Sequence, residues 1–308
     1  MSSGTGSSSQ PPEAAVLCID LGTTRCKIAV VQVVGDSVGS VAPTTVMESA
    51  AFLRGVGAYE EFGDELARRG ANIEQPSAGL AVAFPVPISH LAGGTEPPGM
   101  SWPRGVHTIE EQLGRRFGSP RVTMLNDAVA FALGSIQREP SGEASGRTLY
   151  LTLGMDFGGA IAEPSIGYVT PAELNVLLRG TVWPNGHRGS PAQILMEQPY
   201  VRTDGREWDA EARRGFGELT GWVAGEVSKR RAVEAVVLGG GRANIVDVDD
   251  VGRGMRAVGA TPPPIRIDGR DESALAGAAF AWVTRYVQRR PLAEIIAEPW
   301  AQSNSRGR

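Results

Sequence analysis

Two stretches of the chain repeat one pattern, and this repeat constrains the fold more than any other feature. Each stretch has an apolar run, a turn of small residues and a second apolar run. Runs of β-branched and aliphatic residues around a glycine-containing turn predict paired, buried strands. Glycine in such a turn lets backbone amides approach a ligand. The sequence therefore predicts two hairpins that face each other as a cradle for an anion, which favours phosphoryl transfer. The stretches are VLCIDLGTTRCKIAVVQVV, residues 16–34, and LYLTLGMDFGGAIA, residues 149–162.

Length and charge narrow the class of protein. The 308 residues, 42% of them hydrophobic, can bury a sizeable core, and this length suggests two lobes. The net charge of −4 gives no basic stripe for a duplex, so we expect no nucleic acid as partner. No apolar segment is long enough to span a membrane, so no membrane partner is expected either.

The two cysteines, Cys18 and Cys26, flank the first turn. We expect buried thiols rather than a disulfide, because the polar first residues do not resemble an export signal. A cytoplasmic protein is therefore expected.

Strand-like and helical runs alternate along the chain, which predicts an α/β fold with covered sheets. A long helical pattern at 207–231 precedes a strand-like run and a triple glycine, and the last helix begins near residue 271. We expect a disordered tail at 1–13, an N-terminal lobe at 14–120 with helix 271–290 packing back on it, a C-terminal lobe at 121–270 and a flexible tail at 299–308.

Asp127 is the candidate catalytic residue. It stands where a strand ends and a helix begins, and open α/β sheets bind ligands at such an edge. Transfer of a phosphoryl group to an alcohol needs a base for the hydroxyl proton, and a poorly solvated carboxylate suits that task. The local sequence fits a plain helix cap equally well. Asn126 beside it either binds a substrate hydroxyl or satisfies loop amides.

Asp20 closes the first apolar run. A carboxylate in that place is costly unless something pairs with it, so Asp20 is the candidate ligand of Mg²⁺, directly or through water. A turn-forming aspartate is the alternative. The residues expected to contact a nucleotide or its phosphates are Asp20, Gly22, Thr23, Thr24, Gly154, Gly158, Gly159, Gly239, Gly240 and Gly241.

Other motifs argue against further classes of protein. The histidines, His90, His107 and His187, show no spacing of metal ligands, so no zinc site is expected. The triple glycine does not fit a dinucleotide fingerprint, because Asn244 stands where a glycine is needed, and a dehydrogenase is not expected. Trp102 and Trp183, each in a loop, either stack on a sugar or anchor the packing.

These landmarks, in this order, resemble the ROK family of sugar kinases and regulators, within the actin-like ATPase superfamily. The resemblance covers nearly the whole chain after the tail. DLGTT (20–24) and LTLGMDFGGAI (151–161) are similar to the two phosphate motifs, and LNDA (125–128) to the catalytic Asn-Asp motif. AVAFPVP (81–87) resembles the strand before the proline turn, the loop with Ser101 and Trp102 the sugar-facing loop, VVLGGG (236–241) the adenosine motif and ALAGAA (274–279) the closing helix.

The resemblance implies a two-lobed, ribonuclease H-like α/β fold with a cleft between the lobes, and a homodimer. It also implies a glucokinase-like activity, with a hexose as acceptor, ATP and Mg²⁺ as donor and Asp127 as general base. Polyphosphate is an alternative donor. The implied substrate-binding residues are Asn126, Ser101, Trp102, Pro85, His187 and Glu197.

Three departures from the family pattern favour a second reading. Met155 and Asp156 follow Gly154 where the family has Gly-Thr-Gly, and a carboxylate there repels a triphosphate unless a metal or basic residue intervenes. Val86 replaces a glycine of the proline turn, and the family's Gly-Glu-x-Gly-His segment appears only as PNGH, with His187 kept and Glu197 as the available carboxylate. These changes allow either an altered acceptor or a sensor that binds a sugar or nucleotide without catalysing phosphoryl transfer.

Two relatives of such a kinase are not expected. A DNA-binding regulator would carry a helix-turn-helix before residue 16, and an activating ATPase would carry a cysteine pair that binds a cluster.

Overall fold

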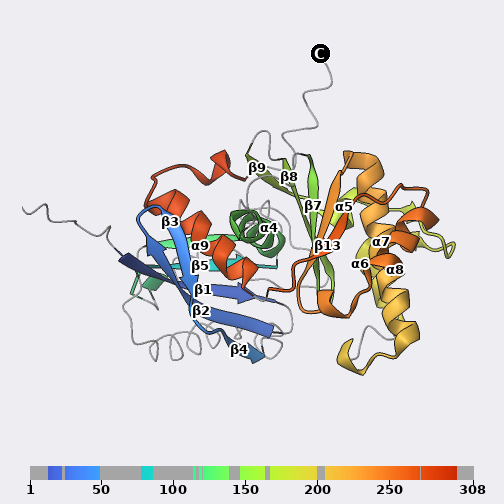
Figure 1. Cartoon of the computed structure of the whole chain (residues 1–308), viewed down its shortest axis with the longest axis horizontal. Helices are drawn as coiled ribbons and strands as arrows, with labels where there is room; N and C mark the ends of the chain where they lie inside the picture. Colours follow the sequence, from blue (N-terminus) through green and yellow to red (C-terminus); the bar gives the residue numbers. More distant parts are fainter. Residues whose placement is uncertain are drawn as a thin grey trace, which may run out of the picture.

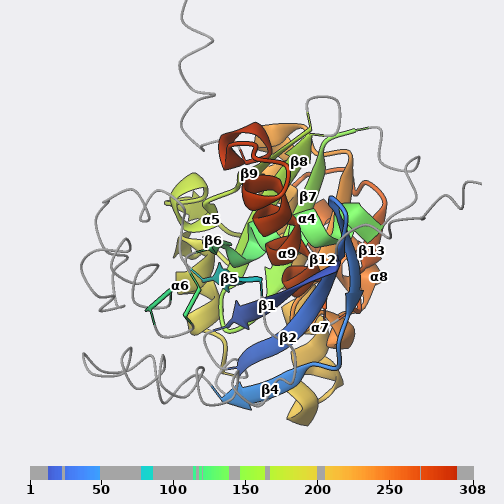
Figure 2. The same cartoon turned by 90° about the vertical axis from the view of Figure 1, so that its left-hand side faces the viewer.

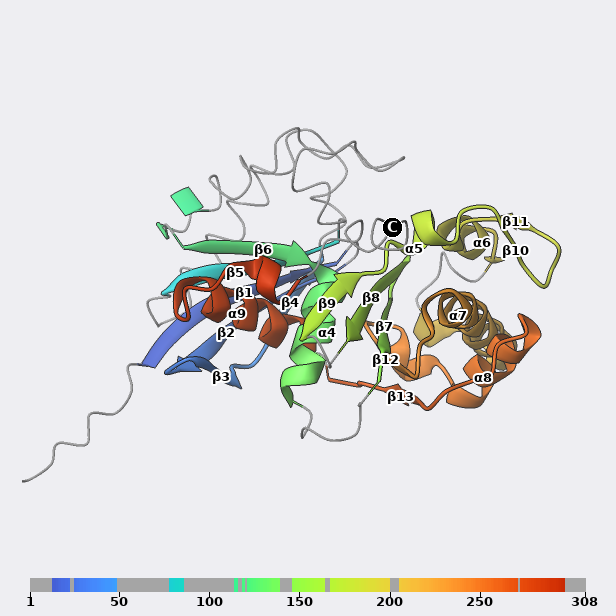
Figure 3. The same cartoon turned by 90° about the horizontal axis from the view of Figure 1, so that it is seen from above.

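The computed structural model contains two β-sheets that stand side by side, each covered by helices (Figure 1). Helix α9 (Ser273–Tyr286) packs on the first sheet, and α4 (Asp127–Arg138) lies between α9 and the second sheet (Figure 3). Helices α7 (Ala210–Arg231) and α8 (Val248–Ala257) cover the outer face of the second sheet. The α/β class predicted from the sequence is therefore confirmed. The structure describes residues 13–22, 25–48, 78–85, 114–115, 118–119, 121–138, 146–163, 167–199, 205–270 and 272–296.

The first sheet has the strand order β3-β2-β1-β5-β6, and β4 also pairs with β2. Strands β1 and β2 are antiparallel, with Leu21 opposite Cys26, so the first predicted hairpin is present. Strands β1, β5 and β6 run parallel. The bounds are β1 Glu13–Leu21, β2 Arg25–Val34, β3 Ser37–Val41, β4 Thr45–Glu48, β5 Gly79–Phe84 and β6 Val122–Asn126.

The second sheet repeats this arrangement, with the order β13-β12-β7-β8-β9. Strands β7 and β8 form the second predicted hairpin, and β12 and β13 run parallel to β7. Apart from β4, each sheet thus joins three antiparallel strands to two parallel ones, so the chain uses one topology twice. The bounds are β7 Thr148–Leu153, β8 Phe157–Glu163, β9 Tyr168–Pro171, β12 Ala235–Gly239 and β13 Ile265–Ile267.

Shorter elements connect these layers. Helix α7 begins later than the pattern at 207–231 predicts, because the Asp209 carboxylate caps it by accepting from the Ala212 amide at 2.8 Å. The short elements are α5 Leu174–Leu177, α6 Pro191–Met196, β10 Thr181–Val182, β11 Arg188–Gly189 and the 3₁₀ turns Gly205–Glu207, Ala243–Ile245 and Leu292–Glu294.

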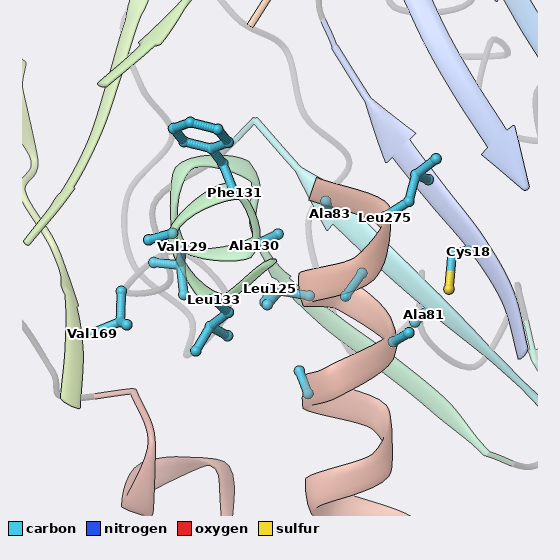
Figure 4. Packing of buried hydrophobic residues seen from close by; sticks show 14 of the residues in the cluster. Cys18, Ala81, Ala83, Leu125, Val129, Ala130, Phe131, Leu133, Val169 and Leu275 are labelled. Carbon is cyan, nitrogen blue, oxygen red and sulfur yellow. The ribbon is translucent and has the colours of Figure 1, made fainter. Parts of the chain in front are cut away.

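The first core forms where α4 and α9 cross at a steep angle, and it joins both sheets (Figures 2 and 4). Cys18 and Ala81 lie under α9, whereas Val129 and Leu133 of α4 point toward Val169 of β9 (Figure 4). A second core lies between the second sheet and helices α7 and α8. Because α4 contributes to contacts on both sides, its position depends on both sheets.

Two glycines allow this crossing. A methyl group on Gly134 would meet the carbonyl of Ser273, and one on Gly277 would meet the carbonyl of Ala130. Both obstacles are backbone atoms, which cannot rotate away. The helix axes can therefore approach closely only while these positions lack a side chain.

We expect Gly277→Ala to destabilise the fold by about 2 kcal/mol, because overpacking of a core costs about 1–3 kcal/mol and outweighs the better helix propensity of alanine. Urea unfolding measures this change. Gly241→Ala is the matched control, since a methyl group there meets no atom within 4 Å. Equal stability of both variants would contradict the close crossing.

One expected boundary is wrong. Strand β6 pairs with β5 and belongs to the first sheet, so this sheet extends to Asn126 instead of ending before residue 121. The reason is that parallel pairing joins strands distant in sequence, which local patterns do not reveal. Glu13, placed in the expected tail, begins β1, and residues 1–12 and 297–308 lie outside the described residues.

Two further expectations meet the structure here. Both cysteines are free and buried, as predicted, and burial raises the pKa of the Cys18 thiol well above its usual range. Among the helices that the structure describes, none combines the length and the apolar character needed to cross a membrane.

Candidate active site

The carboxyl ends of three parallel strands meet at one edge of the first sheet. Asp20 of β1 lies opposite Ala83 of β5, and Phe84 lies opposite Asn126 of β6. Asp127 follows directly, as the first residue of α4. This is the edge at which α/β sheets bind ligands. Four of the expected site residues therefore line it: Asp20, Pro85, Asn126 and Asp127.

Asn126 caps α4. Its Oδ1 accepts hydrogen bonds from the amides of Ala128 at 3.1 Å and Val129 at 3.2 Å. These are the second and third amides of the helix, which an N-cap side chain satisfies. Of the two readings of Asn126, satisfaction of amides is the one observed. Asp127 is thereby not needed as the cap, although its Oδ1 also accepts from the Ala128 amide at 2.7 Å.

Asp20 lies on the sheet face that α4 and α9 cover. Side chains alternate along a strand, so Asp20 shares the face of Cys18, which belongs to the core beneath α9. Asp20 is partly buried and lies near the end of β1, just before the hairpin turn. Its charge acts on Asp127, so the two carboxylates are near neighbours.

The second hairpin lies against the start of α4. A methyl group on Gly158 of β8 would meet the Thr152 hydroxyl and lie 3.4 Å from the Ala128 side chain. In each hairpin turn a glycine amide donates a hydrogen bond across the turn. Gly22 donates to the Arg25 carbonyl at 2.9 Å, and Gly154 donates to the Asp156 carbonyl at 3.1 Å. The second hairpin therefore contacts the start of α4, and an aspartate from each hairpin, Asp20 and Asp156, acts on Asp127 through its charge.

The environment of Asp127 raises the pKa of its carboxyl group into the neutral range. Burial raises its pKa, and the negative charges of Asp20 and Asp156 raise it further, to about 7. The backbone amides of Ala128 and of Asp127 itself oppose this shift without cancelling it. The side chain keeps partial exposure, so it can reach a substrate. A carboxylate with a pKa near the working pH is suited to general base catalysis.

Asp156 stands at the tip of the second turn. Its Oδ1 accepts from the Phe157 amide at 2.7 Å, and its Oδ2 accepts from Asn175 at 3.2 Å. Removal from water raises its pKa, although these two hydrogen bonds oppose that effect. The residue as a whole still keeps a solvent-facing side, so solvent screens part of the action of its charge on Asp127. An amide of the expected phosphate loop is thus already occupied by the chain's own carboxylate.

A basic residue lies at the same turn. The Arg242 guanidinium is buried and donates to the Gly154 carbonyl at 3.0 Å and to the Met155 sulfur at 3.3 Å. It also lies 4.9 Å from the centre of the Trp208 ring, which favours a cation. The sequence indicates that a metal or a basic residue is needed to offset the charge of Asp156. It does not identify Arg242, which follows the triple glycine.

The glycines divide into packing positions and open ones. Phe131 of α4 fills the place of a side chain at Gly239, and Leu174 fills that place at Gly159. Gly240 has a φ of 87° and lies against the backbone of Leu153, so only glycine suits it. Gly241 faces open space. Of the triple glycine, Gly241 is therefore the position with room for a ligand.

His187 and Glu197 contact each other, but away from Asp127. His187 Nδ1 lies 2.7 Å from Glu197 Oε2, and both side chains are about half exposed. His187 lies in the hairpin of β10 and β11, which Figure 3 shows on the far side of the second sheet from α4. The structure thus does not bring this pair to the candidate site.

Trp183 follows the packing alternative: it is buried, and its indole donates to the Gly189 carbonyl at 3.0 Å. The remaining expected residues lie outside the described part of the chain. They are Thr23, Thr24, Ser101 and Trp102, together with Val86, His90 and His107.

Glu173 is a candidate that the sequence reasoning missed. It precedes α5 in the left-handed backbone conformation, with a φ of 45°, and Leu174 after it packs against Gly159 of the second hairpin. Its Oε1 is buried and accepts from no donor in the described part of the chain. Burial raises its pKa to about 7. A buried, unpaired oxygen and a strained backbone make Glu173 a candidate, and no sequence motif signals either feature.

The acidic residues of the site could bind Mg²⁺ only if a bound ligand supplied further oxygen atoms to the ion. Among the described residues, no three histidine, cysteine or carboxylate side chains are placed to hold a metal. Mg²⁺ needs no such cage, because it keeps several waters and binds through one or two carboxylates plus substrate phosphates. Asp20, at the sheet edge beside Asp127, fits that role.

Comparison with known proteins places this geometry in a fold family. No protein-family model matches the sequence, and no curated protein is significantly similar to it. The inorganic polyphosphate/ATP-glucomannokinase from Arthrobacter sp. strain KM matches with a TM-score of 0.62 and 22% identity, over 89% of this chain and 100% of that chain. A ROK family glucokinase from Streptomyces griseus, in complex with glucose and AMPPNP, matches with a TM-score of 0.61 and 19% identity, over 86% and 98% of the two chains.

A ROK family transcriptional regulator, a homolog of the E. coli MLC protein, matches with a TM-score of 0.50 and 13% identity, over 86% of this chain and 77% of that chain. At identities this low, the likeness shows a common architecture only. In this chain that architecture is the pair of sheets with the same strand order. The chain therefore has the two-sheet α/β fold of the ROK family sugar kinases.

Proposed function

We propose that this protein is a carbohydrate kinase that transfers a phosphoryl group from ATP to a hydroxyl of a hexose, with Asp127 as the general base. One observation carries the proposal. Asp127 stands at the carboxyl edge of the first sheet, where an aspartate from each hairpin acts on it through its charge, and its pKa is raised to about 7. The likeness in fold to the glucomannokinase and the glucokinase supports the same reading.

In this proposal each residue of the site has a chemical task. Asp127 takes the proton of the accepting hydroxyl as that oxygen bonds to the terminal phosphorus and the bond to the leaving phosphate breaks. Asp20 holds Mg²⁺, which would neutralise charge on the donor phosphates. Gly22 and Gly154 keep their turns tight enough for backbone to approach those phosphates, and Gly241 leaves room beside the second turn.

Asp156 bears on the identity of the phosphoryl donor, ATP or polyphosphate. Its carboxylate occupies the Phe157 amide and faces any anion that approaches the turn. Arg242, which contacts the Gly154 carbonyl, offsets part of this negative charge. Polyphosphate is the alternative donor, and the likeness to a polyphosphate/ATP-glucomannokinase supports testing it.

The position of the Asp156 carboxylate at the second turn favours a second candidate function, a sensor that binds a sugar without phosphorylating it. An assay with purified protein, Mg²⁺ and a panel of hexoses and amino sugars, with ATP or polyphosphate as donor, separates the two. The kinase predicts sugar-dependent release of ADP or consumption of polyphosphate. Sugar binding in calorimetry without transfer from either donor would support the sensor instead. The homodimer and the cytoplasmic location stay predictions.

Glu173 is proposed as a ligand of a sugar hydroxyl, because the partly buried residue adjoins the second hairpin through Leu174 and its Oε1 accepts from no described donor. We expect Glu173→Gln to raise the KM for the sugar about fivefold, the loss of roughly one hydrogen bond to a charged group, with a smaller effect on kcat. Steady-state kinetics with varied sugar measure this. Glu211→Gln, an exposed glutamate in the first turn of α7, is the control and should leave the KM unchanged. An equal KM for both variants would remove Glu173 from the site.

A further inference from the structure

A second carboxylate occupies the place in the second sheet that Asp127 occupies in the first. Asp127 directly follows β6, the last parallel strand of its sheet, and Asp268 directly follows β13, the last parallel strand of the other. Because the two sheets share one strand order, these positions are topological equivalents. Their surroundings differ, since the side chain of Asp268 is only 1% exposed.

Asp268 is the centre of a hydrogen-bond cluster. Its Oδ2 accepts from the hydroxyls of Ser135 and of Ser273, the latter at 2.9 Å, and from Arg270 Nη2 at 2.9 Å. Its Oδ1 accepts from Arg270 Nε at 2.6 Å and from the Arg270 amide at 3.2 Å. Burial alone would raise its pKa, but these bonds lower it to about 2, and its charge adds to the burial that raises the pKa of Tyr150 to about 12. The carboxylate is therefore ionised at neutral pH, and both of its oxygens accept hydrogen bonds.

The cluster joins three elements that meet at the helix crossing. Ser135 belongs to α4, Ser273 is the first residue of α9, and Asp268 ends the path from β13. An ion pair of 3.3 Å between Arg138 and Glu272 adds a second link between the end of α4 and the start of α9. The carboxyl-terminal half of α4 is thus fixed to the second sheet and to α9 at once.

We propose that Asp268 is a positioning residue for Asp127: by holding Ser135, it fixes the axial position of α4 and with it the carboxylate at the other end of that helix. Ser135 lies eight residues after Asp127 in a continuous helix, about 12 Å along its axis. A helix of this length shifts as a unit, so a displacement at Ser135 reaches Asp127. The inference rests on the proposed role of Asp127 as base.

The two serines provide a matched pair of variants. Ser135→Ala and Ser273→Ala each remove one hydroxyl that donates to the same oxygen, Oδ2 of Asp268, and each leaves the other tether in place. If the cluster only stabilises the fold, the two variants lose similar stability and neither changes kcat below the unfolding temperature. If it positions α4, only the Ser135 variant affects catalysis.

We expect Ser135→Ala to lower kcat about fivefold, with the KM for the sugar nearly unchanged, because a misplaced base slows the chemical step while sugar contacts remain. Ser273→Ala should change kcat by less than about twofold. Equal effects of the two variants on kcat, or none from Ser135→Ala, would overturn the proposal.

Hydrogen exchange followed by mass spectrometry tests the same inference without activity. In Ser135→Ala the amides at the start of α4, including Ala128 and Val129, should exchange faster than in Ser273→Ala. Equal exchange in the two variants would contradict the tether. If the wild-type protein phosphorylates no sugar but the two variants still differ in exchange, the proposed function is rejected and the tether of α4 is supported.

Discussion

Replacement of Asp127 by asparagine is expected to lower kcat by about 100- to 10,000-fold, the usual contribution of a positioned general base. Asparagine keeps the shape of the side chain and can still accept from the Ala128 amide, but it cannot take the hydroxyl proton. The KM for the sugar should change little, because binding does not need the proton transfer. The measurement is steady-state release of ADP at saturating sugar and donor.

Thermal unfolding is the control for this variant. Burial and the charges of Asp20 and Asp156 raise the pKa of Asp127 in the folded state, so its charge destabilises the fold. This penalty grows as the pH rises from about 4, the pKa of an unfolded aspartate, to about 7, and is constant above that. The asparagine variant should therefore unfold at the same or a higher temperature at pH values above 7. An inactive variant that also unfolds earlier would show damage to the fold instead of loss of a base.

Replacement of Asp156 by asparagine is expected to lower the KM for ATP about tenfold, because the several negative charges of a triphosphate each interact with this carboxylate. Asparagine preserves an acceptor for the Phe157 amide, so the turn keeps its shape. The same change removes one of the charges that raise the pKa of Asp127, so the acid limb of the pH profile should move to lower pH. Kinetics with varied ATP at several pH values measure both effects.

Asp249→Asn is the matched control for Asp156. Asp249 is exposed in the first turn of α8, on the outer face of the second sheet, and its replacement should leave both quantities unchanged. A KM for ATP that is unchanged or higher in the Asp156 variant would contradict electrostatic opposition to the donor. With polyphosphate as donor, the same direction of change is expected.

Local patterns predict the parts of this fold that form from consecutive residues. The two hairpins follow from apolar runs on either side of a glycine turn, and their strands pair with each other over nearly their whole length. Asp127 was located because the change from strand to helix is written in the adjacent residues. Asn126 was ambiguous in the sequence, and only the geometry identifies it as the cap of α4.

Pairing between distant segments was not predictable in the same way. Strand β6 follows a long intervening stretch, and its partner β5 lies about 40 residues earlier, so the expected lobe boundary separated two strands of one sheet. Likewise, the resemblance implied that His187 and Glu197 contact the sugar. In the fold, the hairpin with His187 lies away from α4, and Glu197, at the end of α6, contacts His187 there. A motif carries its residues to a site only if the intervening chain has the expected path.

Buried polar groups were the other gap. Glu173 gains its unpaired oxygen and Asp268 its five hydrogen bonds from residues that meet only in the folded state. Gly239 and Gly159 illustrate the reverse case, because a glycine expected to face a ligand instead admits Phe131 or Leu174. Residue type alone does not distinguish a glycine that faces a ligand from one that faces a side chain.

The pH dependence of kcat for sugar phosphorylation tests the central claim most directly. Activity should rise with pH through an apparent pKa of about 7 and then stay level, because Asp127 must be deprotonated to take the hydroxyl proton. A profile that is flat across this range, or whose acid limb lies at about 4 as for an ordinary aspartate, would contradict Asp127 as the base.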